Sequence, residues 1–171
     1  MDVIATLARK RVALGFVTAL VAVIAARPSP TSLQLGFAVA VAGEALRVWA
    51  AGHLEKSREV TRSGPYRWTR HPLYAGSAVI ALGVVIAARS IPLALLTSIY
   101  MAATIGAAIH TEEAFLRRTF GDIYDRYRES SAAPMARRFS MERAMRNREY
   151  RAASGVLVGF ALLALKLLVP I

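Results

Sequence analysis

The side chains best suited to chemistry lie in one short polar segment, residues 64–76, which reads Gly-Pro-Tyr-Arg-Trp-Thr-Arg-His-Pro-Leu-Tyr-Ala-Gly. Pro72 suits the first turn of a helix, where its missing N–H costs nothing, and the free amides of such a turn favour an anionic group. Arg70 and His71 add donors beside this turn, and Tyr74 falls within it. The segment therefore predicts a site for a carboxylate or a phosphate. An ordinary membrane-entry segment has a similar composition, so both interpretations stay open.

Two neighbouring carboxylates, Glu112 and Glu113, form the second cluster. A carboxylate pair at the C-terminal end of a helix opposes the helix dipole and repels itself, so a cation is expected nearby. A neighbouring arginine such as Arg117 could supply the charge, and so could a bound sulfonium that carries an α-amino group. Together the two clusters and their tyrosines offer partners for both ends of S-adenosylmethionine, although physical reasoning alone does not single out this ligand.

Five stretches that are nearly free of charge must position these clusters. They are residues 12–26, 33–52, 73–88, 91–109 and 152–171. A helix needs about 20 apolar residues to cross a bilayer, with a tolerated range of roughly 17–25, and helices satisfy their own backbone hydrogen bonds in lipid. The 171 residues therefore predict an all-α protein, a single polytopic membrane domain with five transmembrane helices. Residues 110–120 are expected to continue the fourth helix beyond the membrane.

The orientation follows from the basic residues, because most of the 22 lie before the first stretch, between the second and third, and between the fourth and fifth. By the positive-inside rule the N-terminus is cytosolic, and both polar clusters face each other on the cytosolic side of what is expected to be a bacterial inner membrane. The charge of +11 predicts contact with anionic lipids. No aromatic-basic recognition module points to nucleic acid, and the absence of cysteine excludes thiolate metal sites. No metal is expected.

Two further charged features each have two interpretations. Glu44 and Arg47 lie one helical turn apart within the second stretch, and they form either an internal ion pair or part of a substrate tunnel. The arginine-rich residues 137–148 form either a basic amphipathic helix on anionic headgroups or a solvated tether to the last span.

The sequences of the two polar clusters also resemble motifs of a known family. Residues 70–76 resemble the R-H-P-x-Y-x-G signature of the isoprenylcysteine carboxyl methyltransferases, and the usual G-P-Y-R precedes it at 64–67. Residues 112–127 are similar to the family's E-E-x-x-L-x-x-x-F-G-x-x-Y-x-x-Y stretch. The Leu-Arg-Val-Trp-Ala run at 46–50 is similar too. The resemblance covers about residues 40–130, and phospholipid N-methyltransferases share the same general plan.

The resemblance implies a bundle of transmembrane helices that encloses S-adenosylmethionine at the cytosolic face, while a lipophilic acceptor enters from the bilayer. It assigns the cofactor to Tyr66, His71, Pro72, Tyr74, Glu112, Glu113 and Tyr124. It assigns catalysis to Arg70, which would orient the acceptor, and to Glu113, the candidate base. The acceptor would be a membrane-embedded small molecule or an isoprenylcysteine-like group, and methylation on O, N or S stays open.

One departure concerns the acceptor. The family has a basic residue and a Val-Pro step soon after the second tyrosine, whereas residues 128–134 read Arg-Glu-Ser-Ser-Ala-Ala-Pro, and about forty more residues with an extra span follow. An NADPH-dependent membrane reductase of the sterol-reductase type is the alternative function, because its sequence ends in a similar arginine–His-Pro–tyrosine segment. The glutamate pair and the Phe-Gly-x-x-Tyr-x-x-Tyr pattern argue against it. A non-catalytic membrane scaffold would leave both clusters unexplained.

Overall fold

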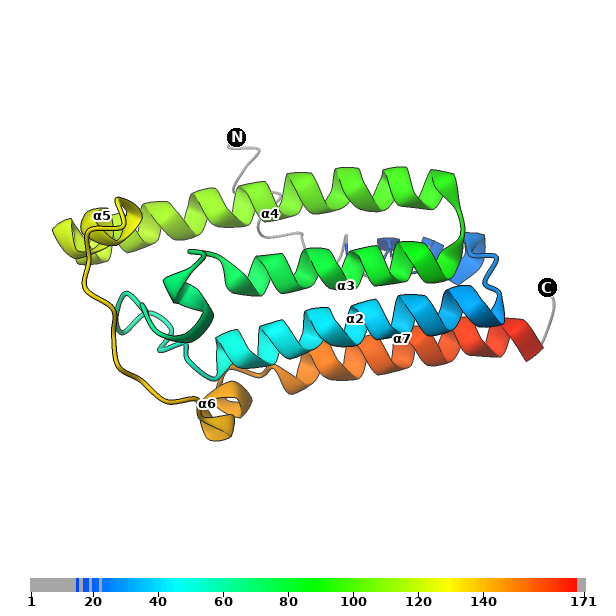
Figure 1. Cartoon of the computed structure of the whole chain (residues 1–171). Coiled ribbons are helices and arrows are strands. Elements are labelled where there is room, and N and C mark those ends of the chain that lie inside the picture. The colour runs from blue at the N-terminus through cyan, green and yellow to red at the C-terminus, as the bar shows by residue number, and fades with distance from the viewer. Residues whose placement is uncertain (1–14, 16, 19, 22, 169–171) are drawn as a thin grey trace.

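The computed structural model of the chain describes residues 15, 17, 18, 20, 21 and 23–168 (Figure 1). All regular elements among these residues are helices, which confirms the predicted all-α class. They are α2 (Pro30–Ala51), the short 3-10 helix η1 (Gly64–Arg67), α3 (Pro72–Ala88), α4 (Ile91–Phe120), α5 (Asp122–Arg128), α6 (Met141–Arg146) and α7 (Tyr150–Leu168).

Three of these helices, α2, α4 and α7, are long and apolar enough to cross a membrane. They correspond to the predicted spans at 33–52, 91–109 and 152–171. The predicted span at 73–88 corresponds to α3, which is apolar but has only 17 residues. The predicted span at 12–26 falls partly outside the described residues. The topology of five spans therefore remains a prediction, whereas the predicted continuation of the fourth helix is confirmed, since α4 runs on to Phe120.

Serine and proline residues set where the long helices begin. Ser29 caps α2, because its hydroxyl accepts from the amide of Ser32 at 3.2 Å while the Ser32 hydroxyl accepts from the Ser29 amide at 2.9 Å. Helices α3 and α4 each have a proline in the first turn, where no backbone donor is lost. Helix α4 ends at Gly121, whose positive φ of 49° turns the chain into α5.

Small residues let α2 and α3 approach closely. A β-carbon added at Gly43 would lie 2.8 Å from the carbonyl oxygen of Gly76, and one added at Gly83 would lie 2.7 Å from the amide nitrogen of Ala40. The obstacles are backbone atoms of the opposite helix, which cannot move aside without separating the helices. Small residues at such contacts are typical of helix pairs in membranes, where close backbone packing replaces the hydrophobic effect.

We expect Gly83→Ala to lower the stability of the protein by about 1–3 kcal/mol, because the added methyl group forces α2 and α3 apart. The measurement is the thermal unfolding midpoint in detergent. Gly155→Ala in α7 is the matched control, since no described atom lies within 4 Å of a β-carbon there and alanine favours a helix over glycine. Equal midpoints for the two variants would contradict a tight α2–α3 contact.

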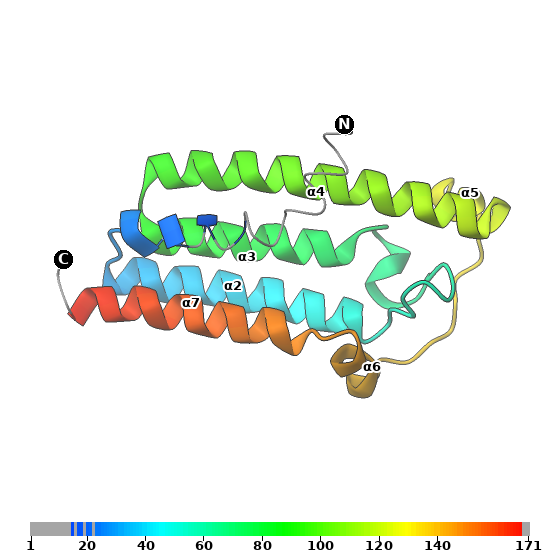
Figure 2. The ribbon, with the colours of Figure 1, turned by 180° about the vertical axis from the view of Figure 1, so that it is seen from behind.

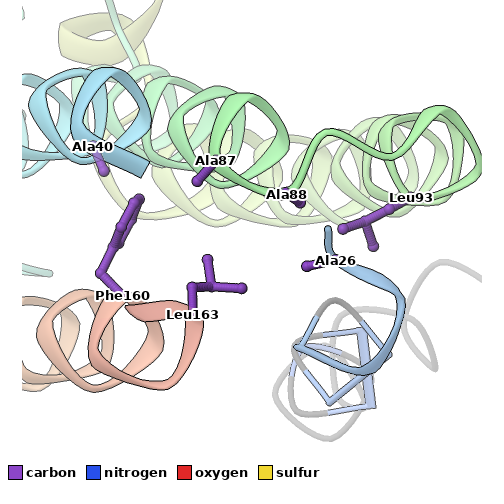
Figure 3. Packing of buried hydrophobic residues seen from close by; sticks show 7 residues of the cluster. All are labelled: Ala26, Ala40, Ala87, Ala88, Leu93, Phe160 and Leu163. Atoms are coloured by element: carbon purple, nitrogen blue, oxygen red, sulfur yellow. The ribbon is translucent and has the colours of Figure 1, made fainter. Parts of the chain in front are cut away.

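Helix α7 covers the other face of the α2–α3 pair. Phe160 and Leu163 point from α7 toward Ala40 and Ala87 of α2 and α3, and all four are buried (Figure 3). Phe160 also meets Phe37 of α2 edge to face, with ring centroids 5.3 Å apart. In both views α2 and α3 lie between α4 and α7 (Figures 1 and 2), so the α2–α3 pair is the centre of the bundle.

The polar segments gather at one end of the bundle. The C-terminal ends of α2 and α4 and the N-terminal ends of α3 and α7 lie there, together with η1, α5 and α6 (Figure 2). This arrangement brings the two segments singled out from the sequence, residues 64–76 and 112–127, to the same end of the molecule.

The arginine-rich segment after α5 packs against the protein at this end. The Arg137 guanidinium donates to both carboxylate oxygens of Glu59 at 2.6 and 2.8 Å, and Arg143 donates to Glu55 at 2.8 Å. The Asn147 side-chain amide donates to the carbonyls of Ala51 and Leu54, at the free C-terminal end of α2. The interpretation as a solvated tether is wrong, because the segment is a docked strap with its own ion pairs. Part of it is helical, as α6, and its contact with headgroups stays a prediction.

The docked strap, residues 135–149, is expected to loosen in acid. The hydrogen bond from Arg143 is the largest effect that lowers the pKa of Glu55 below its ordinary 4.5. A lowered folded-state pKa stabilises the docked form above the ordinary value, and this stabilisation is lost as the pH falls through the folded-state pKa. The protection factors of the strap amides, which compare exchange with the intrinsic rate at the same pH, should therefore fall below a pH of about 4.5.

Glu55→Gln should loosen the strap already at neutral pH, which tryptic cleavage after its arginines would measure. The exposed Glu142→Gln in the same strap is the control and should leave cleavage unchanged. Equal protection in both variants would mean that Glu55 does not hold the strap.

Candidate active site

A cavity of about 760 Å³ opens at the polar end of the bundle between α3, α4, the loop before η1 and the start of α7. Pockets of about 300–1,000 Å³ are typical of small-molecule sites. Most of the predicted site residues line it: Tyr66, Arg70, His71, Pro72, Tyr74 and Glu112. Met101, Ile105 and Leu116 of α4 make part of its wall apolar. The cavity therefore combines ionisable groups with an apolar side.

His71, Arg70 and Glu113 form the central charged cluster beside this cavity. One carboxylate oxygen of Glu113 lies 3.0 Å from the Nε2 atom of His71 and 3.0 Å from a guanidinium nitrogen of Arg70. The two sequence clusters thus meet through this carboxylate. Glu113 itself lies behind the cavity wall. The cation beside the glutamate pair is Arg70, whereas the alternative partner Arg117 pairs with Asp125 of α5 at 3.1 Å.

The other ring nitrogen of His71 lacks a partner. Its Nδ1 atom is buried and has no hydrogen-bond partner among the described residues. A buried polar atom without a partner is costly, and at a functional site it is often completed by a ligand. Tyr74 lies beside the imidazole with ring centroids 5.9 Å apart. His71 is thus held from one side by Glu113 and has a free polar atom on the other.

The start of α3 offers fewer backbone donors than the sequence predicts. Pro72 begins the helix as expected, and His71 is its N-cap residue. The amides of Tyr74 and Ala75, however, both donate to the carbonyl of His71, at 3.1 and 3.0 Å. The anion-binding capacity of this segment therefore comes mainly from the side chains of Arg70 and His71 and less from the helix start.

Three tyrosines complete this side of the site. Tyr127 donates its hydroxyl to the carbonyl of Tyr66 at 2.7 Å, which ties α5 to η1. Burial, and then the charge of Tyr124, raises the pKa of Tyr127 to about 12. Burial, followed by the negative charge of Glu112, also raises the pKa of Tyr66. Tyr124 is fully buried behind the cavity, where burial and the charge of Glu113 raise its pKa. All three side chains stay neutral at physiological pH.

Arg47 of α2 also lines the cavity. Its guanidinium donates to the carbonyl of Leu73 at 3.2 Å, to the hydroxyl of Ser77 at 2.5 Å and to the carboxylate of Glu149 at 2.6 Å. Glu44 lies farther away, at 3.9 Å. The predicted Glu44–Arg47 pair is therefore present only as a long contact, and the close partner comes from the opposite end of the chain.

Sequence reasoning missed Glu149 and Asn147, which also line the cavity. The signal available for them was weak. Glu149 is a lone acidic residue among four arginines between residues 143 and 151, and Arg47 is a cation inside an apolar stretch that needs a partner.

A second, apolar groove of about 460 Å³ lies between α2 and α7. It is lined by Phe37, Val41, Glu44, Ala45, Val48, Trp49, Phe139, Ala153, Val156 and Leu157. Glu44 is the only ionisable residue in this lining, and neither of its carboxylate oxygens has a hydrogen-bond partner among the described residues. Glu44 lines the groove, and Arg47, one turn along the same helix, lines the cavity. The Glu44–Arg47 region therefore lies between the two.

Similar proteins identify the family. The model of the phospholipid methyltransferase family matches residues 31–123, from α2 into α5. The nickel-cobalt-cadmium resistance protein NccN of Alcaligenes xylosoxydans xylosoxydans is 34% identical over 101 residues, 58% of this chain and 46% of NccN. The protein-S-isoprenylcysteine O-methyltransferase of Schizosaccharomyces pombe is 33% identical over 92 residues, 54% of this chain and 39% of that enzyme.

A third relative, the cobalt-zinc-cadmium resistance protein CzcN of Cupriavidus metallidurans, is 29% identical over 106 residues, 61% of this chain and 49% of CzcN. The matches thus span less than half the length of each of these relatives. No solved structure matches. Among the residues that the structure describes, no three His, Cys, Asp or Glu side chains are grouped as metal ligands. Because the family model covers more than half of the chain, including the motif at 64–76 and the start of the motif at 112–127, the chain belongs to the phospholipid methyltransferase family.

Proposed function

We propose that this protein transfers a methyl group from S-adenosylmethionine to a lipophilic acceptor at the cytosolic face of a bacterial inner membrane. The observation that carries the proposal is the Arg70–His71–Glu113 cluster beside a cavity whose wall is partly apolar. The family match covers this cluster and most of the residues that line the cavity.

The residues present fit the cofactor. The buried Nδ1 atom of His71 is available to a ligand. Glu112 lines the cavity and forms no ion pair with the described residues, so it suits the α-ammonium group, and Arg70 suits the carboxylate. Tyr66 and Tyr74 add aromatic surface, which attracts a cationic sulfonium. When bound, S-adenosylmethionine would supply an electrophilic methyl group.

The protein's own contribution is then chiefly positioning and exclusion of water. Glu113 fixes the orientation of His71 and Arg70 through one oxygen, and the buried Tyr124 lies near Glu113. Arg70 is also placed to orient an acceptor. The apolar residues of α4 suit a lipophilic acceptor.

The membrane orientation belongs to the same proposal. Among the described residues, the arginine-rich segments 58–70 and 117–151 lie at the end of the bundle that holds the cavity, and this distribution supports a cytosolic site by the positive-inside rule. Because the sequence has no cysteine, single cysteines report the topology cleanly. In intact cells, Ser90→Cys should react with an impermeant maleimide and Ser131→Cys should not. The reverse pattern would overturn the orientation.

The first experiment is calorimetric titration of the detergent-purified protein with S-adenosylhomocysteine, with NADPH in a parallel titration. We expect S-adenosylhomocysteine to bind with a Kd on the order of micromolar, about −8 kcal/mol, and NADPH not to bind. Binding of NADPH in place of S-adenosylhomocysteine would sink the proposal and favour the reductase alternative.

A further inference from the structure

The cavity is lined by a largely buried ion pair between distant parts of the chain. Glu149 is only 6% exposed, and its Oε1 atom lies 2.6 Å from the Nε atom of Arg47. The remaining Arg47 hydrogen bonds go to Leu73 and Ser77 of α3. Both charged residues line the cavity, so the pair is part of the surface that a bound acceptor would meet.

Only one member of the pair lies within the part of the chain that matches the family model. Arg47 lies within residues 31–123, which match the family model, whereas Glu149 lies beyond them. The docked strap holds Glu149 in place, since the amide of Glu149 donates to the carbonyl of Ala144 and the neighbouring Asn147 is bonded to the end of α2. Glu149 thus reaches the cavity from outside the part of the chain that matches the family model, and the strap's hydrogen bonds position it.

Glu149 changes the charge of the cavity wall at Arg47. An arginine at the wall of an apolar cavity binds carboxylate or phosphate groups strongly, through parallel hydrogen bonds. Here Glu149 occupies the Nε atom of Arg47 and neutralises its charge. An acidic headgroup that approached this part of the wall would meet a negative carboxylate and find the guanidinium already engaged. A neutral group with an O–H donor would meet an acceptor.

We propose that Glu149 determines acceptor specificity, so that the cavity binds lipophilic molecules with a neutral hydroxyl headgroup and rejects those with a carboxylate. The proposal rests on the proposed function only in that this cavity is the acceptor site. Glu149 acts on specificity through charge and is not assigned a chemical step.

The test uses two photoreactive probes with the same sixteen-carbon diazirine chain, one ending in a hydroxyl group and the other in a carboxylate. The purified protein in neutral lipid nanodiscs is labelled with each probe, and labelled cavity peptides are quantified by mass spectrometry. For the wild type we expect the hydroxyl probe to be preferred by about tenfold or more, and for Glu149→Gln we expect the preference to reverse. The exposed Glu142→Gln is the matched control and should behave like the wild type.

A folding defect is separable from this result. Removing Glu149 alone leaves a buried arginine without its partner and can unfold the protein. The double variant Arg47→Gln with Glu149→Gln removes both charges, and it should fold and keep the preference for the hydroxyl probe. A wild type that labels equally well with the carboxylate probe would overturn the proposal. So would a folded Glu149→Gln protein with an unchanged preference.

Titration of the same preparations with S-adenosylhomocysteine separates this proposal from the proposed function. If the wild type does not bind S-adenosylhomocysteine but still prefers the hydroxyl probe, the methyltransferase proposal is rejected and the proposal on acceptor specificity stands. If the wild type binds S-adenosylhomocysteine but shows no probe preference, the proposal on acceptor specificity is rejected and the methyltransferase proposal stands.

Discussion

His71→Ala is expected to weaken binding of S-adenosylhomocysteine by about 10- to 100-fold, which corresponds to the loss of one hydrogen bond to a charged or strongly polar group. The imidazole is held by Glu113 at 3.0 Å, so its second nitrogen is fixed in orientation before any ligand arrives. Alanine removes both the ligand partner and one of the two donors to Glu113. Calorimetric titration measures the change directly.

His110→Ala is the matched control for this substitution. His110 lies in the same helix as Glu113, is exposed and does not line the cavity. Its replacement should leave binding unchanged. An equal loss of affinity in both variants would point to a general effect on the fold, and unchanged affinity in His71→Ala would remove His71 from the site.

Glu113→Gln is expected to have the second large effect. The carboxylate holds Arg70 and His71 with a single oxygen, and the neutral amide of glutamine cannot balance the charge of the guanidinium. Both side chains then lose their fixed positions, so we expect affinity for S-adenosylhomocysteine to fall by about tenfold or more. Transfer of methyl groups, once an acceptor is known, should fall further, because Arg70 is placed to orient the acceptor.

The exposed Glu129→Gln serves as the control for charge alone, since it also removes one negative charge but lies outside the cavity. Glu113→Asp tests position, because it keeps the charge and shortens the side chain. Full binding by Glu113→Gln would show that the cluster is structural and that Glu112 supplies the carboxylate that matters.

The helical framework was predictable from the sequence because burial in lipid leaves an unmistakable pattern. Uncharged stretches located α2, α4 and α7 to within a few residues, and the amphipathic spacing after His110 correctly extended α4 past the apolar region. The pairing of helices was less accessible. The contact of Gly36 and Gly43 with α3 depends on backbone shape, and helix periodicity alone does not reveal which face of α2 meets which neighbour.

The candidate site was predictable in its local part only. Short motifs keep Arg70, His71 and Tyr74 together whatever the rest of the chain does, and the glutamate pair was found for the same reason. The partner of Arg47 was not found, because Glu149 is separated from it by 102 residues and nothing in the spacing connects them. The docking of the strap was not predicted for a related reason, since the sequence does not distinguish arginines that bind protein carbonyls and carboxylates from arginines that bind headgroups.

The separation of Arg47 from Glu149 has a consequence for biosynthesis. When α2 and α3 have been translated, the strap and α7 have not, so Arg47 has only its long contact with Glu44 and lacks its close partner Glu149. A charge within an apolar helix is costly until it is closely paired, so the pairing with Glu149 favours docking of the strap once it has been made. The cavity wall at Arg47 is therefore complete only after residue 149 has been translated.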